Sequence, residues 1–250
     1  MRATARAEAQ HFWFRGFRAF VMPLVRQAVR GTTAPCILDC GCGTGANMAL
    51  LGPSGRTFGF DLSEVGPRIA REAGRTAIAR ATVSAVPFPS ATFDLVTSFD
   101  VLYSLGDEDE REAVAEMFRV LKPGGAAIIN VAAMPMLTGD HSVLSREQRR
   151  YTRASLRTVL ERAGFTIERL TYTNATLFVP LALVRTFHRW RGLSTEVEAQ
   201  QEIAVPPRPV NAVLSALLRV ESLWLRVADN PFGSSLLCLA RKPGATSGPR

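Results

Sequence analysis

Short apolar runs alternate with amphipathic segments along most of the chain. After an apolar run that ends at Asp39, further strand-like runs follow at 56–60, 126–131, 166–173 and 236–240. Between them, apolar residues recur at helical spacing in segments that predict helices at 46–51, 64–72, 107–121 and 152–163. Strands that alternate with helices in this way are typical of an α/β fold with a mainly parallel sheet.

Three glycines at alternate positions follow the first apolar run. The run ends in Asp39, and Gly41, Gly43 and Gly45 come directly after it. Glycine reaches backbone angles closed to other residues and lets a ligand lie against the main chain. A strand, a glycine turn and a helix form the first unit of a nucleotide-binding sheet. The spacing also fits a looser dinucleotide pattern that ends at Ala46, but Asp39 would crowd a pyrophosphate and suits an ammonium group instead.

A second acid, Asp61, ends the next predicted strand, about 20 residues after the turn. A carboxylate at this place can accept two hydrogen bonds from the hydroxyls of a ribose. Leu62 would then face an adenine ring, and Ser63 is expected to cap the following helix. Since both classes of nucleotide ligand carry a ribose, Asp61 indicates a nucleoside without choosing between them.

Several later segments, together with the glycine turn, carry a family resemblance. They lie at 86–89, 91–98, 119–125 and 163–165. With these segments the chain resembles class I S-adenosylmethionine-dependent methyltransferases, well over residues 36–173 and weakly in the last strand. The segments at 11–16 and 149–152 resemble a small-molecule branch of the family, similar to the methyltransferase domains of ubiquinone biosynthesis.

The resemblance implies a Rossmann-like seven-stranded sheet with an antiparallel seventh strand, and S-adenosyl-L-methionine as the cofactor. The residues it implies for cofactor binding are Trp13, Arg18, Asp39, Gly41, Cys42, Gly43, Asp61, Leu62, Thr82, Val83 and Ser98. The N-terminal segment commonly folds over this cofactor in the family, which would bring Arg18 near the methionine carboxylate. The adenine-facing position is often an aspartate in the family, so a hydroxyl or amide contact from Thr82 and Val83 would replace that carboxylate.

The implied reaction is direct in-line methyl transfer to an oxygen, nitrogen or carbon of a small molecule, a secondary metabolite or a lipid-like acceptor. A base is needed only where the acceptor must lose a proton. The two catalytic candidates are His141, which follows the fifth strand, and Tyr103, which faces the site in the family. The family often has Glu-His where this chain has Tyr103 and Ser104, and Ser142 stands where an acid usually neighbours the histidine. The sequence contains no ligand cluster for a metal.

Two other functions stay open from the sequence. A member of this family can bind the cofactor without methylating anything, because a fold does not fix a function. A reductase that uses NAD(P) would need phosphate-binding donors near Ala46, and Asp39 argues against it.

The chain is expected to have four parts: an N-terminal helical cap (1–34), the cofactor-binding core (35–173 and 235–243), a helical insertion (174–234) and a disordered tail (244–250). Without structure of its own, the insertion would be unusually long for a loop. We interpret it as a lid over the acceptor, while a dimer interface or a membrane-surface helix are the alternatives.

Within the insertion, the proline-rich segment 205–209 predicts a non-helical break. A helix is expected after it at 210–227, with Val213, Leu217, Val220 and Trp224 on one stripe. The residues expected to line an apolar acceptor pocket are Leu177, Phe178, Leu181 and Phe187.

The net charge of +8 comes almost entirely from arginine, because Lys122 and Lys242 are the only lysines. The arginines are spread along the chain instead of forming one basic face, so a nucleic-acid partner is not expected. Attraction to acidic small molecules or to an anionic membrane surface stays open.

Cysteine use and hydropathy indicate a cytoplasmic enzyme. Cys36, Cys40, Cys42 and Cys238 fall within predicted strands or the glycine turn, where we expect small buried thiols in a reducing compartment. No apolar run approaches the ~20 residues of a membrane helix, and the first residues do not resemble a secretion signal. The oligomeric state is left open by the sequence.

Overall fold

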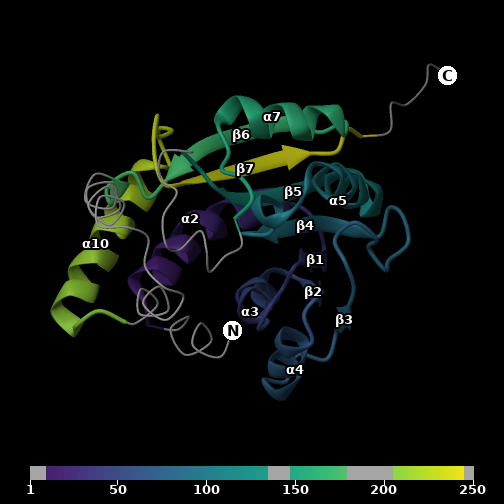
Figure 1. Cartoon of the computed structure of the whole chain (residues 1–250), viewed down its shortest axis with the longest axis horizontal. Coiled ribbons are helices and arrows are strands. Elements are labelled where there is room, and N and C mark those ends of the chain that lie inside the picture. The colour runs from purple at the N-terminus through teal and green to yellow at the C-terminus, as the bar shows by residue number, and fades with distance from the viewer. Residues whose placement is uncertain (1–9, 135–146, 179–204, 245–250) are drawn as a thin grey trace.

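A computed structural model describes residues 10–134, 147–178 and 205–244. Its centre is a seven-stranded sheet with the strand order β3-β2-β1-β4-β5-β7-β6 (Figure 1). The strands are β1 (Cys36–Cys40), β2 (Arg56–Asp61), β3 (Ile78–Arg80), β4 (Phe93–Phe99), β5 (Leu121–Ala132), β6 (Thr166–Thr173) and β7 (Ser235–Arg241). Only β7 runs antiparallel to its neighbours β5 and β6. The predicted Rossmann-like sheet is therefore confirmed.

The helices cover both faces of this sheet. They are α2 (Phe12–Ala28), α3 (Ala46–Leu51), α4 (Val65–Glu72), α5 (Asp107–Val120), α7 (Arg153–Arg162) and α10 (Arg208–Trp224), with short 3-10 turns η1 (Gly52–Ser54) and η2 (Leu102–Ser104). Helices α5 and α7 lie on one side of the sheet, and α2 and α10 lie on the other (Figure 1).

Two apolar cores separate these layers, because alternate residues of a strand point to opposite faces. In β5, Ala127 and Ile129 pack with α5 and α7, whereas Ala126 and Ile128 pack with α2 and α10. The strands are buried on both faces, which explains why they read as continuous apolar runs.

Local signals in the sequence set the ends of several helices. Four acids, Asp107 to Glu110, occupy the first turn of α5, where they complement the positive end of the helix dipole. Thr152 caps α7 as predicted, and it forms a capping box with Ser155. The expected N-cap of α4 is one residue off: Glu64 holds that position, while the Ser63 hydroxyl accepts from the Gly66 N–H at 3.2 Å.

Helix α10 differs most from its prediction. The helix begins at Arg208, so Arg208 and Pro209 belong to its first turn instead of a break, because proline fits a first helical turn. The predicted apolar stripe is exposed instead of packed on the core: Val213 and Trp224 are 60% and 54% exposed. Leu218, on another face of the helix, is fully buried among residues of α2 and the sheet.

The Glu221 side chain fixes α10 to the rest of the molecule. Its buried carboxylate accepts hydrogen bonds from the backbone N–H groups of Ala175 and Thr176, the Thr176 hydroxyl and the Asn230 amide. A buried carboxylate needs such donors. Glu221 therefore lies on the inner face of the helix because of its hydrogen bonds, which the spacing of apolar residues does not reveal.

The remaining predictions on chain organisation have mixed outcomes. All four cysteines are free; Cys40, Cys42 and Cys238 are buried as expected, whereas Cys36, the first residue of β1, is only partly buried. Among the described residues, no helix is long and apolar enough to cross a membrane. Leu177 lies in the core beneath α2 and α10, and the Phe178 ring lies 5.4 Å from that of Phe232. Leu181, Phe187 and the expected tail from 245 onward lie outside the described residues.

Candidate active site

The carboxyl ends of β1, β2 and β4 bring most of the predicted site residues to one edge of the sheet. Strand β1 lies between the other two, with Cys40 in register with Phe60 on one side and Ser98 on the other. Ligands of open α/β sheets bind outside this edge. The three strands therefore present their ends, and the turns that follow, to one common space.

The glycine turn after β1 is tied to the acid that ends β2. The Gly43 N–H donates to Asp61 Oδ2 at 2.9 Å, while Gly41 and Cys42 donate to the Phe60 carbonyl at 2.9 and 3.0 Å. Asp61 Oδ1 in turn accepts from the backbone and hydroxyl of Ser63. These bonds hold the Asp61 carboxylate in one orientation while its oxygens keep further lone pairs for a ligand.

The turn needs its glycines for two different reasons. Gly41 has φ +76°, and a Cβ there would lie 2.4 Å from Val101 Cγ2, so this glycine allows close packing under the turn. Gly43 has φ +50°, but a Cβ there would meet nothing within 4 Å. The space over Gly43 is thus open, as expected where a ligand would lie against the backbone.

Asp39 is a buried acid with an unused oxygen. Its Oδ1 accepts from the Thr97 hydroxyl at 2.8 Å, while Oδ2 has no hydrogen-bond partner in the described part of the chain, although the residue is only 1% exposed. Burial raises the pKa of Asp39 to about 7, the Thr97 hydrogen bond opposes this rise, and the Asp61 charge adds to it. A buried carboxylate of this kind is costly without a donor, and a ligand ammonium group would satisfy it.

The other predicted contacts of the cofactor differ in exposure. Leu62 is 66% exposed beside Asp61, whereas Val83 is buried. The Thr82 hydroxyl lies 3.0 Å from that of Ser84, and the buried Ser98 hydroxyl has no partner. Cys42 packs its sulfur under β2 near Gly59, so only its backbone faces the turn, and burial raises its pKa.

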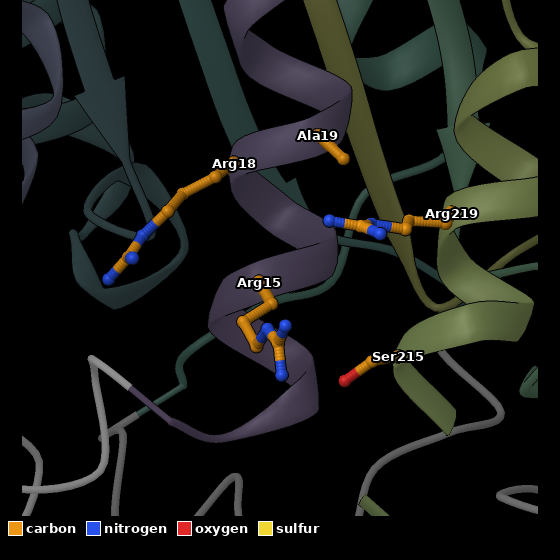
Figure 2. Close-up of a pocket in the computed structure, with 5 residues that line it drawn as sticks. All are labelled: Arg15, Arg18, Ala19, Ser215 and Arg219. Atoms are coloured by element: carbon orange, nitrogen blue, oxygen red, sulfur yellow. The ribbon is translucent and has the colours of Figure 1, made fainter. Parts of the chain in front are cut away.

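The N-terminal helix reaches the same edge of the sheet. The Phe17 ring packs edge-on against that of Phe99, the last residue of β4, at 5.0 Å between ring centres. Arg18 extends to the side of α2 opposite Arg219 of α10 (Figure 2). Trp13 is half-buried in the first turn. Its backbone N–H donates to Nδ1 of the His11 imidazole, which caps the helix. Burial lowers the pKa of His11, which favours its acceptor role.

One acid at this edge was missed by the sequence reasoning. Asp100 directly follows β4, has φ +60°, and accepts a hydrogen bond from the Asn130 amide of β5 at 2.9 Å. Desolvation by neighbouring atoms raises the pKa of its carboxyl group to about 7. The Asn130 hydrogen bond opposes this rise, and the Glu147 charge adds to it. The residue is exposed to solvent, which moderates this desolvation. The signal was present: like Asp39 and Asp61, it is an acid at the end of an apolar strand.

The two predicted catalytic residues have different outcomes. Tyr103 lies in η2 next to Asp100 in the chain, but it is only 8% exposed and belongs to the core cluster that includes Leu102 and Val83. It is therefore less open to an acceptor than expected. His141 lies outside the described residues, so its role stays a prediction. Within the described part of the chain, no group of three or more metal-ligating side chains occurs.

These groups fit the cofactor that the resemblance implies. Asp39 offers a free buried oxygen to an ammonium group, Gly43 leaves room over the turn, and Asp61 is oriented at the ribose position. A dinucleotide would instead place a pyrophosphate close to the Asp39 charge.

A family model described as a methyltransferase domain matches residues 38–129, which contain the glycine turn, both acids of the turn region and Asp100. A probable S-adenosylmethionine-dependent methyltransferase of Mycolicibacterium smegmatis is 26% identical over 79% of this chain and 75% of its own.

Two further comparisons agree with this match. A ubiquinone/menaquinone biosynthesis C-methyltransferase of Pasteurella multocida is 36% identical, over 40% of this chain and 41% of its own length. The alignment thus spans less than half of that relative. A putative methyltransferase of Haloferax volcanii, solved in complex with the Trm112 activator, shares the fold with a TM-score of 0.60. That alignment covers 96% of this chain and 93% of the solved one, at 17% identity.

Proposed function

Since the chain belongs to the class I S-adenosylmethionine-dependent methyltransferases, we propose that it methylates a nucleophilic atom of a small-molecule acceptor. The observation that carries this proposal is the unused buried oxygen of Asp39 beside the open backbone of Gly43. The acceptor class is supported by the relative whose name is that of a C-methyltransferase of ubiquinone/menaquinone biosynthesis.

The strand ends would bind and orient the cofactor. Asp39 would hold the ammonium group of the methionine tail, and Asp61 would hold the ribose hydroxyls. When bound, the cofactor supplies an electrophilic methyl carbon attached to a sulfonium. The contribution of the protein is then to orient the acceptor in line and to exclude water.

Asp100 is the group that we place beside the reacting acceptor atom. It follows β4, the strand next to the glycine turn, and Asn130 fixes its orientation. Its carboxyl group is exposed at the end of the strand, where an acceptor could reach it, and desolvation raises its pKa above the ordinary value. Both features suit a general base. It would take the proton of a hydroxyl or amine acceptor as the methyl group is transferred.

Calorimetry with S-adenosylhomocysteine tests the cofactor site. Asp61→Ala should weaken binding roughly tenfold or more, because it removes charged hydrogen bonds worth about 1.5–3 kcal/mol. Asp109→Ala, which changes an acid in the first turn of α5, should leave the affinity unchanged. An unaltered affinity in Asp61→Ala would remove this residue from the site, and tight binding of a nicotinamide dinucleotide would overturn the proposal.

A screen for methyl transfer tests the reaction. The intact protein is incubated with labelled S-adenosyl-L-methionine and a panel of phenols, amines and lipid-like acids, and products are identified by mass spectrometry. We expect one class to gain a labelled methyl group. Small molecules extracted from the host cells are tested in the same way. If the protein binds the cofactor but labels neither the panel nor this extract, it is a cofactor-binding member of the family without this activity.

A further inference from the structure

A basic cleft lies between α2 and α10, on the far side of α2 from the Arg18 guanidinium. It has a volume of about 240 Å³ and is lined by Arg15, Arg18, Ala19, Ser215 and Arg219. The Arg15, Ser215 and Arg219 side chains point into the space between the helices (Figure 2). Two of the three side chains that point into this space are arginines, and none of the described lining residues is an acid.

The walls of the cleft are fixed by close packing of the two helices. A Cβ at Gly16 would lie 2.3 Å from Leu218 Cδ1, so the helices touch where α2 has no side chain. The Asn211 side chain accepts from the Phe12 N–H at 2.8 Å and donates to the Gln10 carbonyl at 2.9 Å. Arg15 and Arg219 flank this contact, because each is within one residue of Gly16 or Leu218 in the chain.

The positive charge of the cleft is not neutralised by the helices that form it. Helix α2 contains no acidic residue, and the single acid of α10, Glu221, is occupied by donors from Ala175, Thr176 and Asn230. Among the described residues, no carboxylate lies within ion-pair distance of the Arg15 or Arg219 guanidinium. The cleft therefore keeps a net positive field.

Ser215 gives an independent sign of a ligand. The residue is 8% exposed, and its hydroxyl has no hydrogen-bond partner among the described residues. An unsatisfied buried hydroxyl is costly, and an oxygen of a bound anion would accept its hydrogen. Arg219 lies one helical turn further along α10, so both groups present donors on the same side of the helix.

We propose that this cleft binds a phosphate-type oxyanion, held between Arg15 and Arg219 with the Ser215 hydroxyl as a third donor. Guanidinium groups suit this ligand because their N–H donors match phosphate oxygens in a fixed planar fork. The site lies on the opposite side of α2 from the Arg18 guanidinium, which the resemblance places near the cofactor (Figure 2). Resting on the proposed function, we assign the oxyanion to the far end of an elongated acceptor.

Binding of inorganic phosphate and glycerol phosphate, measured by calorimetry in chloride buffer of constant ionic strength, tests the site itself. We expect saturable binding that Arg15→Gln and Arg219→Gln each weaken roughly tenfold, as for loss of a charged hydrogen bond. Ser215→Ala should weaken it less. The matched control is Arg26→Gln, which removes the same charge from an exposed position at the other end of α2 and should leave binding unchanged.

Two further measurements separate this site from the cofactor site and identify its source of phosphate. Affinity for S-adenosylhomocysteine should be unchanged in all these variants, so failure of the oxyanion site is distinguishable from failure of the proposed function. The protein could instead be retained on vesicles of phosphatidic acid but not of phosphatidylcholine, and lose this retention in Arg219→Gln. That result would identify a lipid headgroup in a membrane as the ligand and contradict the assignment to the end of an acceptor molecule. Absence of saturable phosphate binding, or equal weakening in Arg26→Gln, would overturn the site.

Discussion

Two regions of this molecule leave polar groups without partners, and they do so by different means. At the carboxyl edge of the sheet, Asp39 is presented by a strand end next to a backbone turn, and neighbouring backbone amides fix the adjoining Asp61. In the α2–α10 cleft, Ser215, Arg15 and Arg219 project from two helices that touch where Leu218 packs against Gly16. The first arrangement depends on backbone geometry, and the second depends on how two helices pack.

The strongest test of this contrast is a substitution at the glycine turn. Gly43→Val should reduce binding of S-adenosylhomocysteine below detection in calorimetry, because the new side chain would fill the open space over the turn. Gly74→Val is the matched control, since Gly74 also has positive φ and no atom within 4 Å of an added Cβ. Both variants carry backbone strain of about 1–2 kcal/mol, but only the first should lose binding. Normal affinity in a folded Gly43→Val protein would contradict the placement of the ligand.

The helix-packed region is tested by two adjacent leucines. Leu218→Ala should lower the free energy of unfolding by about 2–5 kcal/mol, because it leaves a cavity against Gly16. Leu217→Ala, at a position 40% exposed, should change it by less than about 0.5 kcal/mol. Urea denaturation measures both values. Equal losses would mean that the predicted stripe is a packed face after all. Cofactor affinity should survive in both variants, since neither touches the turn.

Asp100 lies at the end of β4, in the strand-end region, and its substitution tests whether this region supplies a general base. Asp100→Asn should lower kcat about 100-fold or more for a hydroxyl or amine acceptor, as expected for loss of a general base. In the wild type, kcat/KM should rise with pH through the raised pKa of Asp100 and then level off, because the acid must be ionised to take a proton. The variant should lose this rise. An unchanged kcat and pH profile in Asp100→Asn would assign the proton to another group.

The smallest expected effect is the pH dependence of cofactor binding. Because Asp39 has a raised pKa of about 7, most of it is protonated at pH 6 and ionised at pH 8. Only the ionised form pairs with an ammonium group, so affinity for S-adenosylhomocysteine should rise about tenfold between these pH values. Asp39→Asn should bind more weakly and without this dependence. Calorimetry in buffers of different ionisation enthalpy would also detect proton release below pH 7 in the wild type.

The same contrast explains which features could be predicted from the sequence. Asp39, Asp61 and the glycine turn follow one another within a short span, and their local pattern determined where they lie in the fold. Asp100 carries the same signal of an acid after an apolar strand, yet no spacing rule singled it out. Its pairing with Asn130 depends on strands β4 and β5 being neighbours, which only the sheet topology provides.

The orientation of α10 could not be predicted from periodicity. The apolar stripe through Leu217 and Val220 has regular helical spacing, but the helix buries the face that contains Ser215 and Glu221. Glu221 is satisfied by groups distant in the chain, and Leu218 fits only because position 16 is glycine. Both determinants are tertiary contacts. The face that α10 buries is therefore not its most hydrophobic face.

The hydrogen bonds of Glu221 have a consequence for how this protein can evolve. Its carboxylate binds Ala175 and Thr176, just after β6, and Asn230, shortly before β7. The chain therefore leaves β6 and returns to β7 through residues that bind one side chain of α10. Because both ends of this connection are held in the same way, we expect changes of sequence between them to leave the two strands in place. An acceptor preference could then change during evolution while the cofactor edge stays the same.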